Sequence, residues 1–315
     1  MTGFKSYFYK WVEQYLFFPN FFQKLVSVAL FPFTILYCVV VAYKRTTAKP
    51  IDFGIPIISV GNLIVGGSGK TPVTIALASQ VIKKKVAIIL RGYGRKSKGL
   101  IVVSNDSKIL EDVDTSGDEA LVLAKSLPSA TIIVSENRKE AIVKALELGA
   151  KIVFLDDGYR HHDIKKTDIL LRPEIEPTNI FCLPSGGYRE TKMMYSFADI
   201  VLIEEEDFKR EVTFSHNNAI LETLPSDIIL LTAISKPQRL LKFLPKNIKV
   251  ISYPDHYYFM ESDIDELMAN YGNSYIVTTL KDYVKLEKFK MKRIILMNLG
   301  VTIDEEKVAK LMLNN

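Results

Sequence analysis

The sequence predicts an α/β fold with a mostly parallel sheet and helices on both faces, a second, smaller α/β lobe, and an N-terminal membrane-associated helix. Three observations predict it. Short apolar runs alternate with segments of helical periodicity after residue 50. A glycine-rich loop follows the first of these runs and ends in Gly-Lys-Thr. Residues 25–43 form an apolar run that carries no charge.

Length and composition describe an ordinary globular chain. Its 315 residues suffice for one large or two modest domains, and 48% of them are hydrophobic while 24% are charged. The net charge of +5 suits an anionic substrate or an anionic membrane surface and does not require nucleic acid. With only Cys38 and Cys182, the chain offers neither a disulfide framework nor a zinc site, which indicates a reducing compartment.

The N-terminal segment combines aromatic, apolar and basic residues. Ten aromatic side chains lie between residues 4 and 22, and the uncharged run at 25–43 spans 19 positions, near the lower limit for crossing a bilayer. Pro32 predicts a kink in this helix. The segment could span the membrane, lie in its interface, or be a buried helix of a soluble fold. The aromatic and basic flanks, including Lys44 and Arg45, favour the interface.

The strands are expected at the apolar runs, several of which are apolar on both faces, as in strands covered on both sides. They are residues 56–60, 86–90, 100–104, 131–135, 151–156, 168–172, 199–204, 227–234, 249–253, 275–279 and 293–298. Segments of helical period lie between many of them, at 72–83, 118–127, 136–148, 236–243, 261–270 and 304–313. This alternation is typical of βαβ units in a mostly parallel sheet.

Proline and glycine cluster between residues 173 and 190, which indicates a boundary between two parts of the fold. We therefore expect three parts. Residues 1–45 form the membrane-associated segment, residues 46–172 the nucleotide-binding core, and residues 173–315 a second α/β lobe that contributes to the substrate and nucleotide cleft.

The stretch from residue 59 to residue 79 predicts a phosphate-binding loop of the P-loop NTPase type. Glycine lets backbone N–H groups turn toward a phosphate, and the N-terminus of the following helix adds its positive dipole end. Lys70 is expected to reach the β- and γ-phosphates and Thr71 to ligate Mg²⁺. Ile64 stands where the general pattern has its first glycine, so a plain glycine turn is the alternative. The residues expected to bind the nucleotide are Gly66, Gly67, Ser68, Gly69, Lys70 and Thr71.

Two carboxylates end a predicted strand further along the chain. Asp156 and Asp157 close the run at 151–156, and Gly158 permits a sharp exit from the strand. A P-loop needs such an acidic partner on a neighbouring strand to hold Mg²⁺ directly or through water. A solvated strand end is the alternative. These residues predict an ATP–Mg²⁺ site without naming the acceptor of the phosphate.

Eight motifs occur in order between residues 59 and 286: SVGNLIVGGSGKTP, ILRGYGRKSKG, GDEALVLA, SENR, LDDGYRHH, LPSGGYRE, YPDHYYF and TTLKDYVKL. Together they resemble the tetraacyldisaccharide 4'-kinase family, also called lipid A 4'-kinases. The chain departs from the family pattern at Tyr159 and Arg160, where Phe-Gln is usual, and at Thr191, where proline is usual. These departures leave the charged residues in place, so they bear on substrate preference more than on the reaction.

The resemblance implies an ATP- and Mg²⁺-dependent kinase that phosphorylates the 4'-hydroxyl of a tetraacylated glucosamine disaccharide 1-phosphate. The product is the 1,4'-bisphosphorylated lipid A precursor. The resemblance places the enzyme at the cytoplasmic face of the inner membrane. Its expected partners there are the acylated disaccharide lipid and the inner-leaflet surface. Neither nucleic acid nor an obligate protein partner is expected.

The resemblance also assigns catalytic roles. Asp118 is expected to act with His256, because an aspartate–histidine hydrogen bond orients the imidazole and raises its basicity, so that the pair can take the hydroxyl proton. Lys70 is the third catalytic residue. From the residues alone, Asp118 could instead be the N-cap of the helix predicted at 118–127, and the YPDHYYF segment could be a structural turn.

Charged residues near the predicted strand ends complete the expected site. The basic loop at 91–98 has four cations in eight residues, which suits a phosphorylated lipid, although a solvated loop is the alternative. Lys281 and Asp282 could contact the nucleotide base. The metal ligands are expected among Thr71, Asp156, Asp157 and Glu190, and the substrate-binding residues are Arg91, Arg95, Glu119, Arg138, His161 and Arg189.

Two other functions fit part of the sequence. A membrane-docked P-loop switch ATPase would account for the glycine-rich loop and the apolar N-terminus, but not for Asp118 and His256 or for the basic loop. A soluble P-loop kinase of a small metabolite would have no use for residues 1–45 in membrane binding. Lipid-dependent consumption of ATP distinguishes the expected kinase from the switch ATPase. The soluble kinase predicts that deleting residues 1–45 leaves membrane fractionation and activity unchanged.

Overall fold

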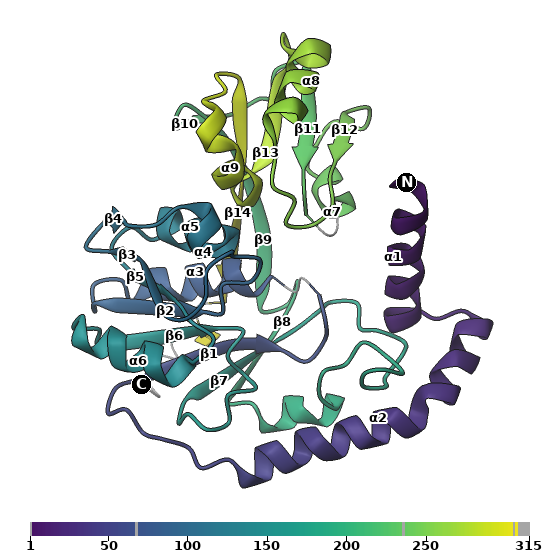
Figure 1. The fold of residues 1–315 in the computed structure, drawn as a ribbon, viewed down its shortest axis with the longest axis vertical. Coiled ribbons are helices and arrows are strands. Elements are labelled where there is room, and N and C mark those ends of the chain that lie inside the picture. The colour runs from purple at the N-terminus through teal and green to yellow at the C-terminus, as the bar shows by residue number, and fades with distance from the viewer. Residues whose placement is uncertain (1, 67–68, 235–236, 305, 308–315) are drawn as a thin grey trace. The chain divides into compact units, whose positions relative to one another are not determined.

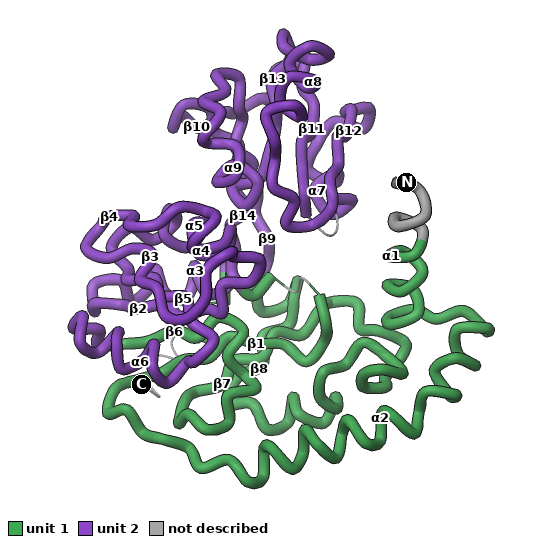
Figure 2. Tube along the Cα trace, in the orientation of Figure 1, with its two compact units in different colours: residues 1–70, 152–208, 303–315 green, residues 71–151, 209–302 purple. Residues whose placement is uncertain are grey.

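The computed structural model describes residues 2–66, 69–234, 237–304 and 306–307 (Figure 1). The chain divides into two compact units, each assembled from separate segments (Figure 2). Unit 1 holds residues 1–70, 152–208 and 303–315, and unit 2 holds residues 71–151 and 209–302. Each unit therefore draws on chain from both sides of the boundary predicted near residue 173, and that three-part division stays a prediction.

Two helices begin unit 1. These are α1 (Thr2–Phe17) and α2 (Phe21–Thr47), and α2 continues through Pro32. Asn20 and Gln23 form a capping box at the start of α2, with both side chain–backbone distances at 3.0 Å. By length and composition, α2 is the one helix among the described residues that could cross a membrane.

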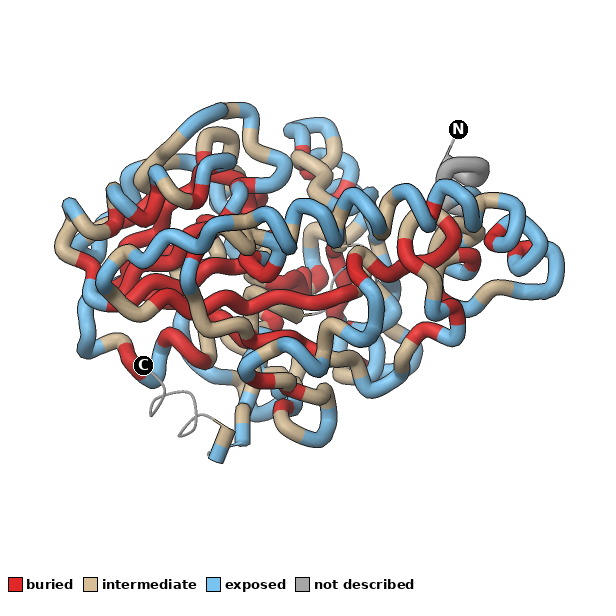
Figure 3. Tube along the Cα trace, turned by 90° about the horizontal axis from the view of Figure 1, so that it is seen from below, coloured by how far each residue is buried: buried red, intermediate tan, exposed pale blue. Residues whose placement is uncertain are grey.

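One face of α2 is buried against its own unit, and this face carries polar side chains. Asn179 Nδ2 lies 3.4 Å from Ser27 Oγ, Thr34 Oγ1 donates to Ser185 Oγ at 2.7 Å, and the Tyr37 hydroxyl donates to a backbone carbonyl at 2.8 Å. Most of the remaining helix surface is exposed and apolar, so α2 is not the buried core helix that one interpretation of the sequence allowed. Figure 3 shows the long N-terminal helix largely in pale blue, the colour of exposed residues.

The sheet of unit 1 has four parallel strands in the order β6, β1, β7, β8. They are β6 (Ile152–Asp156), β1 (Ile57–Asn62), β7 (Thr167–Arg172) and β8 (Ile200–Ile203), and a 3₁₀ turn, η1 (Lys192–Phe197), precedes β8. Every residue of β1 and β6 is buried, as the two-sided apolar runs predict. The two strands run parallel, so their carboxyl ends, Asn62 and Asp156, open at the same edge.

The first part of unit 2 has the strands β4 (Lys108–Ile109), β3 (Ile101–Asn105), β5 (Thr131–Val134) and β2 (Val86–Leu90), in that order. β2 and β5 are parallel, whereas β3 is antiparallel to β4 and β5. The helices of this part are α3 (Lys70–Gln80), α4 (Val113–Ser116), α5 (Asp118–Ser126) and α6 (Arg138–Glu147). α3 starts at the last residue of unit 1.

The second part of unit 2 is a six-stranded sheet in the order β10, β9, β14, β13, β11, β12. Its strands are β9 (Phe208–His216), β10 (Ala219–Leu221), β11 (Ile228–Thr232), β12 (Lys249–Ser252), β13 (Tyr275–Thr279) and β14 (Ile294–Ile303). Its helices are α7 (Gln238–Leu241), α8 (Glu261–Tyr271), α9 (Leu280–Leu286) and the 3₁₀ turn η2 (Glu287–Phe289). Alternate residues of β11 and β13 feed two separate apolar clusters, so both faces of this sheet are covered.

The α/β class and the mostly parallel strands are confirmed. All eleven predicted strands coincide with observed ones, and five of the six predicted helices overlap observed helices; the sixth, at 304–313, lies largely outside the described residues. The sequence reading missed α1, α4, α9, β4 and the β9–β10 hairpin.

Candidate active site

The glycine-rich loop leaves β1 at Asn62 and enters α3 at Lys70. Gly66 and Gly69 have φ angles of +93° and +79°, in the region that side chains disfavour, so both positions require glycine. Gly67 and Ser68 lie outside the described residues. Because α3 begins at Lys70, the backbone N–H groups of its first turn and its positive dipole end point toward the loop, as phosphate binding requires.

Lys70 lies beside the end of β6. Its ammonium is 3.3 Å from Asn62 Oδ1 and 3.8 Å from Asp157 Oδ1. The Asn62 side chain is itself held, because its Nδ2 donates to the Ile64 carbonyl at 2.7 Å. Asn62 was not among the predicted site residues; its position directly after an apolar strand and before the glycines was the available signal. Lys70 is thus held by Asn62, the last residue of the strand that precedes the glycine-rich loop.

The acidic end of β6 combines a buried and a half-exposed carboxylate. Asp156 is buried as the last residue of the strand, and Asp157 follows with a positive φ of 56°. A Cβ on Gly158 would lie 2.4 Å from the Cβ of Leu155, so glycine is required here because a side chain would not fit. The sharp turn at the end of the strand is made by Asp157, whose φ is positive. Arg189 Nη1 donates to both Asp157 oxygens, at 2.9 and 3.1 Å. Asp157 therefore bridges Lys70 and Arg189.

The segment at 183–190 lies against the entrance of the loop. Val65 N donates to the Gly187 carbonyl at 2.9 Å, and Arg189 N donates to the Leu63 carbonyl at 2.7 Å. These bonds fix the backbone from which the Arg189 side chain extends. The LPSGGYRE motif and the glycine-rich loop, more than a hundred residues apart in the sequence, form one site in unit 1.

Glu190 is buried among basic side chains. Arg45 of α2 lies 3.6 Å from Glu190, His162 also 3.6 Å, and Arg160 3.8 Å. Within the described part of the chain, no group of three or more His, Cys, Asp or Glu side chains could hold a metal. The structure does join Asp157, Arg189 and Lys70, whereas Glu190 lies in a separate cluster of basic side chains. His161 is tied by its backbone N–H to the Gly158 carbonyl at 3.0 Å.

Asp118 and His256 meet in unit 2, although they are 138 positions apart in the sequence. Nδ1 of His256 lies 2.9 Å from Oδ2 of Asp118, whose other oxygen accepts the Glu119 N–H at 2.8 Å. The predicted hydrogen bond is confirmed. The N-cap of α5 is Gly117, with φ at 84°, so the alternative that Asp118 caps the helix is wrong.

The backbone at His256 is strained. Its φ is +58°, a conformation that a non-glycine residue adopts at a cost of about 1–3 kcal/mol and that concentrates at functional sites. The loop at 91–99 supports it. The Tyr93 ring lies 5.7 Å from the imidazole, and the Tyr258 hydroxyl donates to the Gly94 carbonyl at 3.0 Å. The RGYGRKSKG motif therefore supports the YPDHYYF motif.

The electrostatics of the pair favour an ionised carboxylate and a basic imidazole. Burial is the largest single effect on the pKa of Asp118 and raises it, but the hydrogen bond from His256 and the charges of Lys281, His256 and Lys285 together outweigh it, so this pKa lies below its ordinary value. The hydrogen bond to Asp118 raises the pKa of His256, although burial opposes it. Lys281 lowers and Asp255 raises the pKa of the same imidazole.

We expect His256 to titrate above its ordinary pKa of 6.5. In Asp118→Asn the carboxylate charge is lost, so the pKa of His256 should fall toward or below 6.5. The ring proton shifts in NMR spectra, recorded across pH for both proteins, give the two midpoints directly. An unchanged midpoint in Asp118→Asn would contradict the assigned hydrogen bond.

Arg95 and Arg138 are bonded to groups of their own unit. Arg95 Nη2 donates to Glu136 Oε1 and to the Gly99 carbonyl, both at 2.6 Å. Arg138 is buried and donates to the Ser135 carbonyl, whereas Arg91 is exposed. Arg95 thus shapes the basic loop, and its role toward the substrate, like that of Arg91 and Arg138, stays a prediction.

The TTLKD motif lies beside the Asp118–His256 pair. Asp282 is fully buried and bonded to protein groups, so the hypothesis that it contacts a nucleotide base is wrong. Lys281 lies 3.8 Å from Glu119 and 3.4 Å from Asp255. Lys285, four residues further on, is buried beside Asp282. Sequence reasoning missed Lys285, because a lysine in a helix ordinarily reads as a surface residue.

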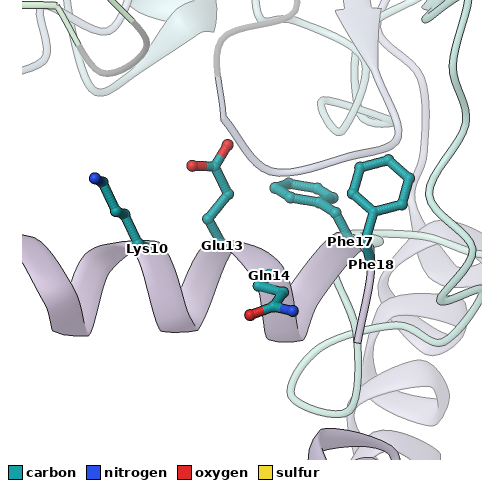
Figure 4. Close-up of a pocket in the computed structure, with 5 residues that line it drawn as sticks. All are labelled: Lys10, Glu13, Gln14, Phe17 and Phe18. Carbon is teal, nitrogen blue, oxygen red and sulfur yellow. The ribbon is translucent and has the colours of Figure 1, made fainter. Parts of the chain in front are cut away.

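A surface pocket lies elsewhere, along α1 (Figure 4). It is lined by Lys10, Glu13, Gln14, Phe17 and Phe18. None of the predicted site residues lines it, so it is distinct from both charged sites described above.

The fold and the unit 1 site define a class of protein. A strand, a glycine loop ending in Lys-Thr, a helix, and an acidic neighbour on the adjacent parallel strand are the parts of a P-loop nucleotide-dependent phosphotransferase. The Asp118–His256 pair adds a group able to accept a proton.

Comparisons with known proteins narrow the class to one family. The family model for tetraacyldisaccharide-1-P 4'-kinase matches residues 26–315. The tetraacyldisaccharide 4'-kinase of Aliarcobacter butzleri (strain RM4018) is 58% identical over 96% of this chain and 95% of its own length. That of Helicobacter acinonychis (strain Sheeba) is 45% identical over 95% of this chain and 93% of its own. This chain belongs to the tetraacyldisaccharide-1-P 4'-kinase family.

The fold has a solved relative as well. The crystal structure of LpxK from Aquifex aeolicus in complex with ATP has a TM-score of 0.76 to this chain at 29% identity. The likeness covers 92% of this chain and 98% of that one.

Proposed function

We propose that this protein transfers the γ-phosphate of ATP to the 4'-hydroxyl of a tetraacylated glucosamine disaccharide 1-phosphate, yielding the 1,4'-bisphosphorylated lipid A precursor. Membership of the kinase family supports the reaction. The observation that carries the assignment in this chain is the 2.9 Å contact between Asp118 and His256. Transfer of a phosphate to an alcohol requires a proton acceptor, and this pair supplies one. A switch ATPase, which only hydrolyses ATP, would not use this pair.

The groups of unit 1 act on the phosphate. Lys70 neutralises charge on the transferred group, and the amides of residues 66–71 bind the phosphates of ATP. Mg²⁺ bound with ATP would supply positive charge to the phosphates. Asp157 is half-exposed beside Lys70, and a magnesium ion bound mainly by phosphates and water needs only one or two carboxylates, so Asp157 fits this role best. Thr71, Asp156 and Glu190 remain candidate ligands.

The groups of unit 2 act on the acceptor. The Asp118 carboxylate orients the imidazole and stabilises its positive charge, so the pair accepts the proton as the sugar oxygen attacks the γ-phosphate. We assign substrate binding to five basic side chains and to the residue after Asp118. These are Arg91, Arg95, Glu119, Arg138, His161 and Arg189, and Arg189 is already placed by its bonds to Asp157.

We place the protein on the cytoplasmic face of the inner membrane, with α2 lying in the interface. Ser27, Thr34, Tyr37 and Arg45 contact unit 1 along the length of α2. A helix that is covered along one side by its own catalytic unit can present the opposite, apolar side to lipid only by lying along the surface. Lys44, which is exposed near the end of α2, suits anionic headgroups.

The exposed side of α2 provides a test. Phe33 and Leu36 are 62% and 63% exposed. Replacing both with serine removes apolar area from the membrane contact, so binding to anionic phospholipid vesicles should weaken by about tenfold or more, with the KM for ATP unchanged. Val143→Ser, on the exposed surface of α6, is the matched control and should bind vesicles normally. Wild-type vesicle binding by the double variant would contradict the interfacial assignment.

Mass spectrometry of the lipid product tests the function itself. The purified protein is incubated with a tetraacylated disaccharide 1-phosphate, ATP and Mg²⁺, and the lipid should gain the mass of one phosphate. ATP consumption should depend on the lipid. ATP turnover that proceeds equally without lipid, with the lipid mass unaltered, would refute the kinase and favour a membrane-docked switch ATPase.

A further inference from the structure

Two lysines on α9 face the carboxylate of Asp118. Lys281 and Lys285 are four residues apart, which places them on one face of the helix, and each ammonium lies 3.9 Å from Oδ2 of Asp118. α9 packs against α5, the helix that begins at Asp118. The carboxylate that bonds to His256 is therefore also in contact with two positive charges, neither of which has a role in the proposed function.

Lys285 is buried to a degree that is rare for lysine. Its side chain is 1% exposed, and lysine is almost never fully buried unless it is paired. Its ammonium lies 3.0 Å from Asp282 Oδ1 but makes no hydrogen bond of good geometry within the described residues. Its other carboxylate neighbour is Asp118. A buried ammonium in this situation stabilises any negative charge that faces it.

Asp282 holds Lys285 in place. Its Oδ2 accepts hydrogen bonds from Thr232 Oγ1 at 2.9 Å, from Ala233 N at 3.1 Å and from Thr279 Oγ1 at 3.1 Å. With three donors on one oxygen, the carboxylate cannot rotate, and its second oxygen stays directed at the lysine. The sheet residues thus fix the Asp282 carboxylate, and this carboxylate in turn fixes the position of the Lys285 ammonium.

Lys281 links the two members of the proton-accepting pair. Its ammonium contacts Asp118, Glu119 beside it, and Asp255, which directly precedes His256. Its side chain is 23% exposed. It therefore joins the start of α5 to the strained segment that carries the imidazole.

We propose that Lys281 and Lys285 are positioning residues for phosphate transfer, whose ammonium groups keep the buried Asp118 carboxylate ionised and directed at His256. A carboxylate that is 3% exposed would otherwise be driven toward its neutral form, and a neutral carboxyl would neither orient nor stabilise an imidazolium. Neither lysine needs to touch a substrate. The kinetic part of this inference rests on the proposed function, whereas its electrostatic part does not.

The test replaces each ammonium by an uncharged side chain of similar length. In Lys281→Met and Lys285→Met a positive charge near the pair is lost, so the protonated form of the pair is favoured. The acid limb of kcat and the NMR midpoint of the Asp118 carboxyl carbon should both move to higher pH by about one unit. At pH values above the new midpoint kcat should recover. Lys281→Arg keeps the charge and should retain the wild-type midpoint.

Folding effects are separated by two further variants. Lys285→Met with Asp282→Asn removes a buried ion pair as a whole and avoids leaving an unpaired charge, so it serves if Lys285→Met does not fold. Lys125→Met is the matched control. Lys125 lies 2.8 Å from Glu287 and joins α5 to η2 without contacting Asp118, so its loss should leave both midpoints unchanged.

Unaltered Asp118 midpoints in the folded variants at positions 281 and 285, or an equal shift in Lys125→Met, would overturn the proposal. The NMR titration needs no substrate. A wild-type protein that fails to phosphorylate the lipid would therefore refute the proposed function alone and leave the positioning role to be decided by the midpoints.

Discussion

Lys70→Ala is expected to abolish phosphate transfer, lowering kcat by roughly a hundredfold to a thousandfold or more. The ammonium of Lys70 lies between Asn62 and Asp157 at the start of α3, where the phosphate chain of ATP is expected to bind. Charge that develops on the transferred group would lose its fixed positive partner, and no mobile water dipole replaces a preorganised cation in a protein site. Rates of phosphate incorporation into lipid measure the effect.

The fold should survive this substitution. Asp157 keeps two hydrogen bonds to Arg189, and Asn62 keeps its bond to the Ile64 carbonyl, so the loop entrance stays anchored. Lys84→Ala, an exposed lysine just beyond α3, is the control and should retain wild-type kcat. Turnover of Lys70→Ala within a few-fold of wild type, with an unchanged melting temperature, would remove Lys70 from the mechanism.

Local patterns predicted much of the sheet and the glycine loop. The runs at 86–90 and 275–279 match β2 and β13 to the residue, because each is a short, mostly apolar segment that the fold buries almost completely. The glycine positions followed from backbone geometry, and Gly66 and Gly69 do have positive φ. In these places the local sequence and the tertiary environment favour the same structure.

The elements that were missed depend on contacts or on weaker signals. β9 and β10 form a hairpin whose turn residues, Asn217 and Asn218, both have positive φ, and asparagine pairs between alternating strands are a known signal of such turns. α9 has only seven residues, too few for a clear period, and its start was marked by Thr279 three positions before Asp282.

Predicting the residues of the site required both the local sequence patterns and the family motifs. The proximity of Asp118 and His256 followed only from the family motifs, since nothing local links residues 138 positions apart. Neither local patterns nor family motifs could predict the burial of Lys285. It results from the packing of α9 on α5 and from the hydrogen bonds that hold Asp282 beside it. Residues whose environment is made by distant segments are where sequence patterns carry least information.

Asp118→Asn and His256→Gln are each expected to lower kcat by about a hundredfold or more, with little change in ATP affinity. The two side chains form one proton-accepting unit, because the carboxylate orients the imidazole and raises its pKa. Once either member is lost, the other has no partner to act with. The double variant should therefore be no slower than the slower single variant.

Single-turnover transfer rates and ATP titrations of the three variants measure these effects separately. His216→Gln is the control: this histidine also lies in unit 2, but its Nδ1 bonds to the Ile294 carbonyl at 2.8 Å and it should tolerate replacement with wild-type kcat. Independent action of the two residues predicts a double variant slower than either single by the product of their effects. Multiplicative losses would show that the 2.9 Å contact is structural, and that the hydroxyl proton leaves by another route.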